Sequence, residues 1–276
     1  MINSDVSLVE MLEDSFLRYR DNPALRIEND IYSYSELLQH SRFISNAIVD
    51  IAPERSRVAI LAARTLVAYS SILATTLAGR CYVPLSRRLP AERVLDVLKR
   101  CEASILIVDE DCADSFDSIA EHIRDLTVLL PKVGAKLLEV MKRHSHLSFL
   151  VLDRVGDGSE ISFRQTIGAE DEVYIIFTSG TTGHAKGVPV CHGNIVALLR
   201  ALRQRYDIGP GDNYSQVPDL TFDASVRDMF FSFTTGATLC VIPEHALLAP
   251  AEYINKYSLT VWHSVPSVAL LMESFR

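Results

Sequence analysis

The chain has 276 residues, of which 48% are apolar, so it can form one large domain or two smaller ones with a sizeable core. It carries 27 Lys and Arg against 35 Asp and Glu, and this net charge of -8 argues against general nucleic-acid binding, which needs clustered cations. No basic segment leads into an apolar run at the N-terminus, and no apolar stretch is long enough to cross a bilayer, which predicts a cytoplasmic protein without membrane contact.

The first fifty residues predict a helix, a hairpin and a second helix. Apolar residues recur at helical spacing over residues 8–19. Two extended runs, residues 24–28 and 31–34, are separated by the turn-forming pair Asn29-Asp30. Ser35 is then the expected N-cap of the following helix.

Beyond residue 56, strand-length and helix-length segments alternate. Strands are expected at residues 57–63, 81–85, 105–109, 149–153, 173–177, 213–217, 238–242 and 259–262. Helices are expected at residues 65–78, 90–102, 194–206, 223–235, 250–257 and 267–275, with two more over 115–146 that break near Pro131 and Gly134. Residues 156–159 predict a loop. The predicted fold class is therefore α/β, with layered parallel β-sheets flanked by helices.

The five cysteines form no CxxC pair and are odd in number. This spacing is typical neither of a disulfide framework nor of a zinc site, so no metal ligands are predicted. Inert thiols are the simplest interpretation of Cys81, Cys101, Cys112, Cys191 and Cys240.

The richest chemistry lies directly after the strongly β-forming run that ends at Phe177. Residues 178–187 hold three glycines, four hydroxyl side chains and one lysine. Glycines let backbone N–H groups converge on one point, hydroxyls donate further hydrogen bonds, and Lys186 can follow negative charge developing on a leaving phosphate. This combination suits a polyphosphate. Its expected ligands are Thr178, Ser179, Gly180, Thr181, Thr182, Gly183 and Lys186.

Composition alone leaves two other interpretations of this segment. One is a hydrophilic turn without a ligand. The other is the P-loop of nucleoside triphosphatases, which requires Gly, four residues, and then Gly-Lys-Ser/Thr. Here Lys186 is followed by Gly187 and lies three residues after Gly183, so the P-loop pattern fails.

Residues 174–188, Tyr-Ile-Ile-Phe-Thr-Ser-Gly-Thr-Thr-Gly-His-Ala-Lys-Gly-Val, resemble the phosphate-loop signature of the adenylate-forming superfamily. That superfamily includes acyl-CoA synthetases, luciferases and nonribosomal peptide adenylation domains. Residues 34–37, 77–85 and 222–225 resemble the first, second and fourth core motifs of peptide-synthetase adenylation domains, in the same order. Ala185 departs from the family's usual proline, which loosens the loop but removes no phosphate ligand. The resemblance covers essentially the whole chain.

The resemblance also implies where a substrate would bind. In peptide-synthetase adenylation domains, the aspartate that matches Asp223 holds the α-ammonium group, and acyl-CoA synthetases generally lack it. From the residues alone, the favoured role of Asp223 is a helix N-cap, and the ordinary interpretation of Arg227 is a solvated surface cation. By resemblance, Arg227 and His263 line the side-chain pocket, and Phe222 and Ala224 flank Asp223. Two cationic or hydrogen-bonding groups favour an acidic or polar side chain.

The activity implied by the resemblance is ATP-dependent formation of an acyl-adenylate. An amino-acid carboxylate would attack Mg-ATP, with Lys186 stabilising charge, and the acyl group would pass to the phosphopantetheine thiol of a peptidyl or acyl carrier protein. An MbtH-like helper protein is a further implied partner; nucleic acid and membrane are not. His192 matches a position that often carries histidine, for which a helix-start hydrogen bond and an active-site role are both open.

The relatives' remaining motifs, including the principal catalytic lysine on a small C-terminal lid domain, are not found in this sequence. Residues 1–276 are therefore expected to be the N-terminal (large) adenylation subdomain, truncated, with weak ATP binding and no turnover alone. Two other functions stay open. One is an acyl- or aryl-acid ligase of the same superfamily, which Asp223 argues against. The other is a non-catalytic interaction module with an adenylation fold.

Overall fold

The computed structural model describes residues 7–53, 55–152, 167–179, 185–243, 245–246, 250–268 and 270. The chain divides into two compact units. Unit 1 comprises Met1–Leu38 and Ile195–Arg276, and unit 2 comprises Gln39–Asn194. Two helices run across the division, α2 (Tyr34–Ile51) and α7 (His192–Arg205).

Unit 2 is built on a seven-stranded sheet with the order β7-β6-β5-β3-β4-β8-β9. Its strands are β3 (Arg57–Leu61), β4 (Cys81–Leu85), β5 (Ile105–Val108), β6 (Thr127–Leu130), β7 (Ser148–Val151), β8 (Glu172–Ser179) and β9 (Ala185–Cys191). Every neighbouring pair is parallel except β8 and β9, which are antiparallel. The prediction of a parallel sheet flanked by helices is confirmed for this unit.

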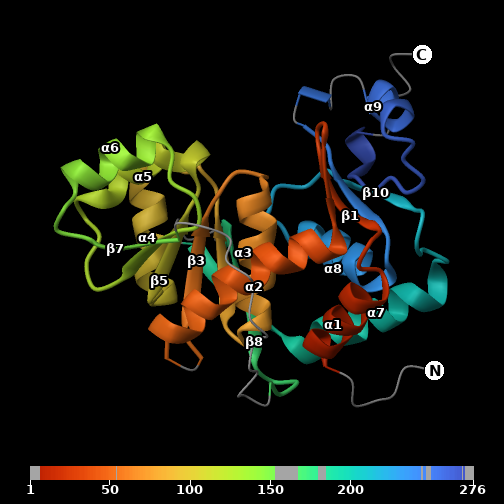
Figure 1. Cartoon of the computed structure of the whole chain (residues 1–276), viewed down its shortest axis with the longest axis horizontal. Helices are drawn as coiled ribbons and strands as arrows, with labels where there is room; N and C mark the ends of the chain where they lie inside the picture. Colours follow the sequence, from red (N-terminus) through yellow and green to blue (C-terminus); the bar gives the residue numbers. More distant parts are fainter. Residues whose placement is uncertain are drawn as a thin grey trace. The chain divides into compact units, whose positions relative to one another are not determined.

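Helices cover both faces of the unit 2 sheet. They are α3 (Leu66–Leu77), α4 (Ala91–Cys101), the short 3-10 helix η1 (Glu110–Cys112), α5 (Ala113–Ala120) and α6 (Ala135–Arg143). Alternate strand residues such as Ala59 and Leu61 share one buried cluster with α4, α5 and α6, which gather on one side of the strands (Figure 1). Val58 and Ile60 are also buried and point to the other face, against which α3 packs.

Unit 1 contains a four-stranded sheet with the order β10-β11-β1-β2. Its elements are β1 (Pro23–Ile27), β2 (Asp30–Ser33), β10 (Asn213–Gln216), β11 (Thr238–Val241), α1 (Leu8–Arg18), α8 (Asp223–Thr235) and α9 (Pro250–Lys256). Helices α1 and α8 pack together through aromatic rings: the Phe16 centroid lies 4.9 Å from that of Tyr34 and 5.9 Å from that of Phe233. This packing anchors α8, which carries the predicted substrate residues.

Two strands of unit 2 were not predicted. β6 lies within residues predicted as helical; its run Thr-Val-Leu-Leu is short and apolar, and such runs have no distinguishing period. β9 lies in residues to which no strand was assigned, partly within the predicted phosphate loop; Gly187 and Pro189 make its sequence atypical of a strand. Since β9 is the edge strand of the sheet, it tolerates a residue without an N–H donor.

Two predictions in unit 1 were wrong. The N-cap of α2 is Ser33 rather than Ser35: the Ser33 hydroxyl accepts from the Glu36 N–H (3.2 Å), and the Glu36 carboxylate accepts from the Ser33 N–H (2.7 Å). The strand predicted at residues 259–262 is reduced to one bridge between Val261 and Tyr214. The loop predicted at 156–159 and most of the helix at 267–275 lie outside the described residues.

Candidate functional site

The predicted phosphate segment is framed by β8 and β9 in unit 2. Thr178 pairs with Lys186 across the two strands, and Ser179 pairs with Ala185. These pairs lie at the carboxyl end of β8, the edge at which parallel sheets bind ligands. Both Thr178 and Lys186 are exposed to solvent. The residues between the strands, Gly180, Thr181, Thr182, Gly183 and His184, lie outside the described part of the chain.

Close packing holds β9 against β8 at Gly187. A Cβ atom at Gly187 would lie 2.9 Å from Ile175 Cγ2 and 3.0 Å from Phe177 Cζ, which is too close for any other residue without a shift of these side chains. A glycine at position 187 is therefore required by the packing of the two strands and is also part of the phosphate motif. It sets the register in which Lys186 faces Thr178.

A groove of about 500 Å³ in unit 2 is lined by Lys186 and by two arginines. Arg57 is paired with Glu172 at 3.1 Å, and Arg100 with Asp96 at 2.7 Å. The Lys186 ammonium group makes no ion pair with the side chains that the structure describes. Of the three cations in the groove, Lys186 is thus the one that an anionic ligand can approach without displacing a carboxylate.

His192 begins α7 and is buried, with 2% of its surface exposed. Its backbone N–H donates to the Asp171 carbonyl at 3.0 Å, but neither ring nitrogen has a hydrogen-bond partner among the described residues. Burial lowers the pKa of the imidazole to about 4, against a smaller opposing effect of Asp171. The ring is therefore neutral at pH 7, and it makes no helix-start hydrogen bond with the described residues.

The predicted substrate residues of unit 1 lie at the start of α8. Phe222 occupies the N-cap position without a side-chain hydrogen bond, and Asp223 is the first helical residue. Asp223 is exposed, and its carboxylate makes no hydrogen bond or ion pair with described residues of its unit. Phe222 is largely exposed and Ala224 half-buried. The N-cap interpretation of Asp223 is thus wrong, and its carboxylate is left available for a ligand near the positive end of the helix.

Arg227 and His263 are brought together in unit 1, although the sequence separates them by 36 residues. Arg227 Nη1 lies 2.7 Å from His263 Nε2, and Arg227 Nη2 donates to the Tyr214 hydroxyl at 3.1 Å. On its other side, His263 Nδ1 lies 2.7 Å from Asp228 Oδ1. Asp228 and Tyr214 have no exposed surface. These four residues form one network, called the α8 network here.

Burial governs the acidities within the α8 network. It raises the pKa of the Asp228 carboxyl group, while His263 and Arg227 act in the opposite direction. Burial also raises the pKa of the Tyr214 hydroxyl, and the negative charge of Asp228 adds to this. Sequence reasoning missed Asp228 and Tyr214. The available signal was a carboxylate inside the otherwise apolar run that follows Arg227.

The described residues contain no group of three or more His, Cys, Asp or Glu side chains suited to a metal. Mg²⁺ bound with a nucleotide keeps several waters and takes one or two carboxylates, so it does not need such a group. As to membranes, none of the described helices combines the length and the apolar character that a bilayer span requires.

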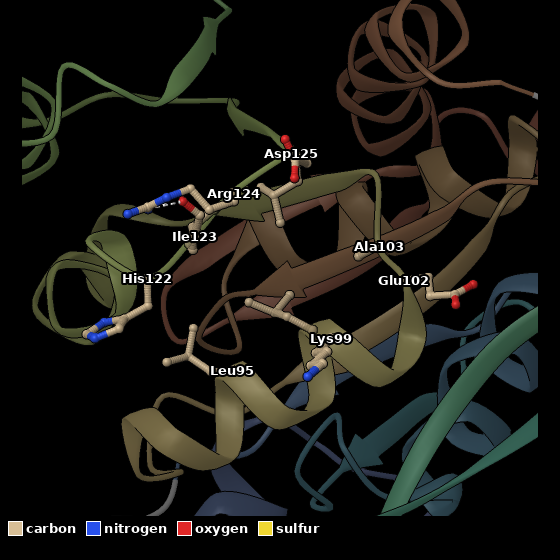
Figure 2. Close-up of a pocket in the computed structure, with 10 residues that line it drawn as sticks. Leu95, Lys99, Glu102, Ala103, His122, Ile123, Arg124 and Asp125 are labelled. Carbon is tan, nitrogen blue, oxygen red and sulfur yellow. Dashed lines mark hydrogen bonds between the residues drawn. The ribbon is translucent and has the colours of Figure 1, made fainter.

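A separate pocket of about 510 Å³ lies in unit 2 between the end of α4 and the segment after α5 (Figure 2). Its charged side chains point in different directions, as Lys99, Glu102 and Asp125 show (Figure 2). Arg124 Nη1 donates to the carbonyl groups of Glu121 and Ile123 at 2.6 and 2.5 Å, so this guanidinium is already engaged. The pocket lies at the amino ends of β5 and β6, away from the edge where parallel sheets bind ligands.

The chain belongs to the AMP-binding enzyme family, whose model matches residues 12–274. The family and the fold class predicted from the sequence are both confirmed.

Individual relatives agree with this assignment. The chain is 27% identical to an L-proline--[L-prolyl-carrier protein] ligase of Pseudomonas fluorescens, over 96% of this chain and 51% of the ligase. It is 27% identical to surfactin synthase subunit 1 of Bacillus subtilis, over 95% of this chain and 7% of that subunit. The adenylation domain AlmE of Vibrio cholerae, solved in complex with glycyl-adenosine-5'-phosphate, superimposes with a TM-score of 0.89 at 30% identity, covering 100% of this chain and 52% of AlmE. The chain thus spans about half the length of the ligase and of AlmE.

Proposed function

We propose that this chain is the N-terminal (large) part of an amino-acid adenylation domain, which activates an amino acid with ATP and passes it to a carrier protein. The observation that carries the proposal is the Asp223 carboxylate at the start of α8, which has no partner among the described residues of its unit, in a chain of the AMP-binding enzyme family. A fatty or aryl acid has no cation for this carboxylate, whereas an amino acid brings an α-ammonium group.

The nucleotide would be bound by unit 2. The proposed ligands are the backbone N–H groups and hydroxyls of residues 178–183, together with Lys186. Two facts support this role: Thr178 and Lys186 face each other at the carboxyl end of β8, and the Lys186 ammonium group has no carboxylate partner among the described side chains. Backbone amides and one mobile cation are sufficient to bind phosphate oxygens even in a chain of net charge -8.

The amino acid would be bound by unit 1. Asp223 would hold the α-ammonium group, and Phe222, Ala224, Arg227 and His263 would surround the remainder. Support comes from AlmE, which was solved with a glycyl-adenylate, and from the prolyl-carrier ligase, whose name gives both an amino acid and a carrier protein. Both are relatives in which the matched part is about half of the protein.

The proposed reaction has two balanced steps. A carboxylate oxygen of the amino acid forms a bond to the α-phosphorus of ATP, and the α–β phosphoanhydride bond breaks to release pyrophosphate. The thiol of a carrier protein then attacks the carbonyl carbon, loses its proton, and AMP leaves with the bonding electrons. Since a carboxylate needs no deprotonation at neutral pH, the protein's part in the first step is positioning and charge stabilisation.

Further components are part of this proposal. Mg²⁺ would accompany ATP and neutralise phosphate charge, and phosphopantetheine on the carrier would supply the thiol. An MbtH-like helper protein and a cytoplasmic location remain predictions. A C-terminal lid domain with the principal catalytic lysine would complete the enzyme, consistent with the half-length match to relatives.

ATP–pyrophosphate exchange tests the proposal. The full-length protein, meaning residues 1–276 together with its C-terminal portion, would be screened with twenty amino acids and several aryl acids. We expect exchange with one or a few amino acids and none with aryl acids. Exchange with aryl acids alone would identify an aryl-acid ligase, and no exchange with any acid would favour a non-catalytic module. Residues 1–276 alone are expected to give no measurable exchange.

A further inference from the structure

Hydrogen-bond chemistry assigns the proton of His263 in the α8 network. A guanidinium group only donates, so His263 Nε2, at 2.7 Å from Arg227 Nη1, must accept. The ring proton therefore resides on Nδ1 and is donated to Asp228 Oδ1 at 2.7 Å. The backbone N–H of His263 also donates to Ser215 Oγ at 2.9 Å, which holds the His263 backbone beside β10.

This assignment determines the charge of the α8 network. Arg227 carries one positive charge, His263 is neutral, and Asp228 carries one negative charge, so the network sums to zero. Asp228 has no exposed surface, and 24% of the His263 side chain is exposed, so water screens the charges weakly. The positive charge of Arg227 is thus already balanced through the imidazole by a buried carboxylate.

A substrate carboxylate beside Arg227 would change this balance. It would give this largely buried network a net charge of -1, at a desolvation cost that no further cation of the network offsets. An uncharged side chain leaves the sum at zero and can still receive hydrogen bonds from the guanidinium. The negative charge of Asp223 is not counted in this net charge, because the positive α-ammonium group of the substrate would neutralise it.

We propose that the amino acid selected at this site has an uncharged side chain, and that Asp228 is the positioning residue that enforces this choice by neutralising Arg227 through His263. The inference rests on the proposed function and narrows it. Of the acidic and polar side chains that the sequence favours, only the uncharged ones are compatible with the α8 network.

The test compares side chains of equal size and different charge. Pyrophosphate exchange by the full-length protein is measured with Glu and Gln, and with Asp and Asn, for the wild type and for Asp228→Asn. The wild type is expected to favour the amide of each pair. Asp228→Asn keeps an acceptor for His263 Nδ1 but leaves Arg227 unbalanced, so the acid-to-amide ratio of kcat/KM should rise at least about tenfold.

Two further variants guard against a purely structural effect. Arg227→Gln makes the α8 network negative, so its acid-to-amide ratio should fall below that of the wild type. Asp219→Asn removes a carboxylate from the segment before α8, where Asp219 accepts from Thr221 and not from the network, and its ratio should stay unchanged.

A readout independent of activity is the tautomer of His263, measured by ¹⁵N NMR of the imidazole. A neutral ring protonated on Nδ1 supports the inference, and an Nε2-protonated or doubly protonated ring overturns it. Preference of the wild type for Glu over Gln, or for Asp over Asn, overturns it as well. Absence of exchange with every amino acid would instead refute the proposed function, so the two failures are distinguishable.

Discussion

His192 in unit 2 and His263 in unit 1 show how differently one side chain is used in the two parts of this molecule. His263 has a hydrogen-bond partner at each ring nitrogen, Asp228 on one side and Arg227 on the other. His192 is almost completely buried, yet neither of its ring nitrogens has a partner among the described residues. One imidazole connects two charges, and the other fills space as a neutral ring.

The same contrast extends to the surroundings of the two proposed binding regions. In unit 2, the groups that would meet ATP are backbone amides, small hydroxyls and the exposed Lys186, which suit a ligand common to the whole family. In unit 1, the groups that would meet the amino acid are side chains held by a buried network, whose charge depends on each member. On the proposed roles, ATP would be recognised at an exposed strand end, whereas selection among similar amino acids would use fixed side chains.

Removing the carboxylate of Asp223 should have the largest effect. In the full-length protein, we expect Asp223→Ala to lower kcat/KM for the amino acid by about 10²- to 10³-fold, because the α-ammonium group would lose its counterion. Asp223→Asn should give an intermediate loss. ATP affinity, measured by calorimetry, should stay unchanged. Asp207→Ala, at an exposed position of the same unit, is the control.

If Asp223→Ala catalyses ATP–pyrophosphate exchange with amino acids as efficiently as the wild type, the proposed role of Asp223 in binding the α-ammonium group is contradicted. This result would also remove the reason to prefer an amino acid over other carboxylic acids.

Replacing His192 should remove an acid-sensitive component of stability. The unfolded chain binds a proton near pH 6.5, whereas the folded imidazole binds one only near its pKa of about 4. Stability conferred by the neutral ring is therefore full above pH 6.5 and is lost as the pH falls from 6.5 to 4, by on the order of 3 kcal/mol. His192→Leu should show a smaller loss over this range in urea unfolding. His122→Leu, at an exposed position, should follow the wild type.

An identical pH dependence of wild type and His192→Leu would show that the His192 ring gains a partner in solution. The contrast with His263 would then disappear.

Lys186 should matter for ATP and little for the choice of amino acid. We expect Lys186→Ala to lower kcat/KM for ATP by roughly 30-fold, on the order of 2 kcal/mol, because one charge-assisted hydrogen bond to phosphate is lost. Lys186→Arg should retain part of the activity, since the charge is kept. Lys136→Ala on α6 removes an exposed cation paired with Asp114 and is the matched control. A change in the ranking of amino acids would contradict the separation of roles.

Sequence reasoning predicted the elements that carry the site better than the site itself. The bounds of α8 match because Gly236, at a φ of 85°, ends the helix where glycine is favoured. β8 was predicted from its dense β-branched and aromatic residues, although it is longer than expected. β9 was missed because Gly187 and Pro189 mimic a loop, and only the edge position in the sheet makes them acceptable.

The partners of Arg227 show where sequence reasoning stops. The resemblance to a family placed Arg227 and His263 near each other. It did not indicate that Tyr214, 13 residues before Arg227, accepts from the guanidinium, or that Ser215 binds the His263 backbone across 48 residues. Such contacts depend on the pairing of β10 with the segment at Val261, which no local pattern encodes. The charge balance of the α8 network therefore emerges only from the fold.

The smallest effect concerns two buried tyrosine hydroxyls, which repeat the contrast between the histidines. The Tyr34 hydroxyl in unit 1 lies 3.1 Å from the Ser232 carbonyl and 2.8 Å from the Ala237 carbonyl, to which it donates. The Tyr82 hydroxyl on β4 is buried without a partner among the described residues. Tyr34→Phe should cost about 1 kcal/mol in the free energy of unfolding, because both carbonyls lose a donor.

Tyr82→Phe should increase the free energy of unfolding or leave it unchanged, because removing an unpaired buried hydroxyl removes a desolvation cost of up to about 1 kcal/mol. Urea unfolding of the two variants with the wild type measures both values. Both variants lose one tyrosine hydroxyl, so they differ only in whether the lost hydroxyl was hydrogen-bonded. Equal destabilisation by the two substitutions would mean that the Tyr82 hydroxyl is also hydrogen-bonded. The contrast between a paired hydroxyl at Tyr34 and an unpaired one at Tyr82 would then be wrong.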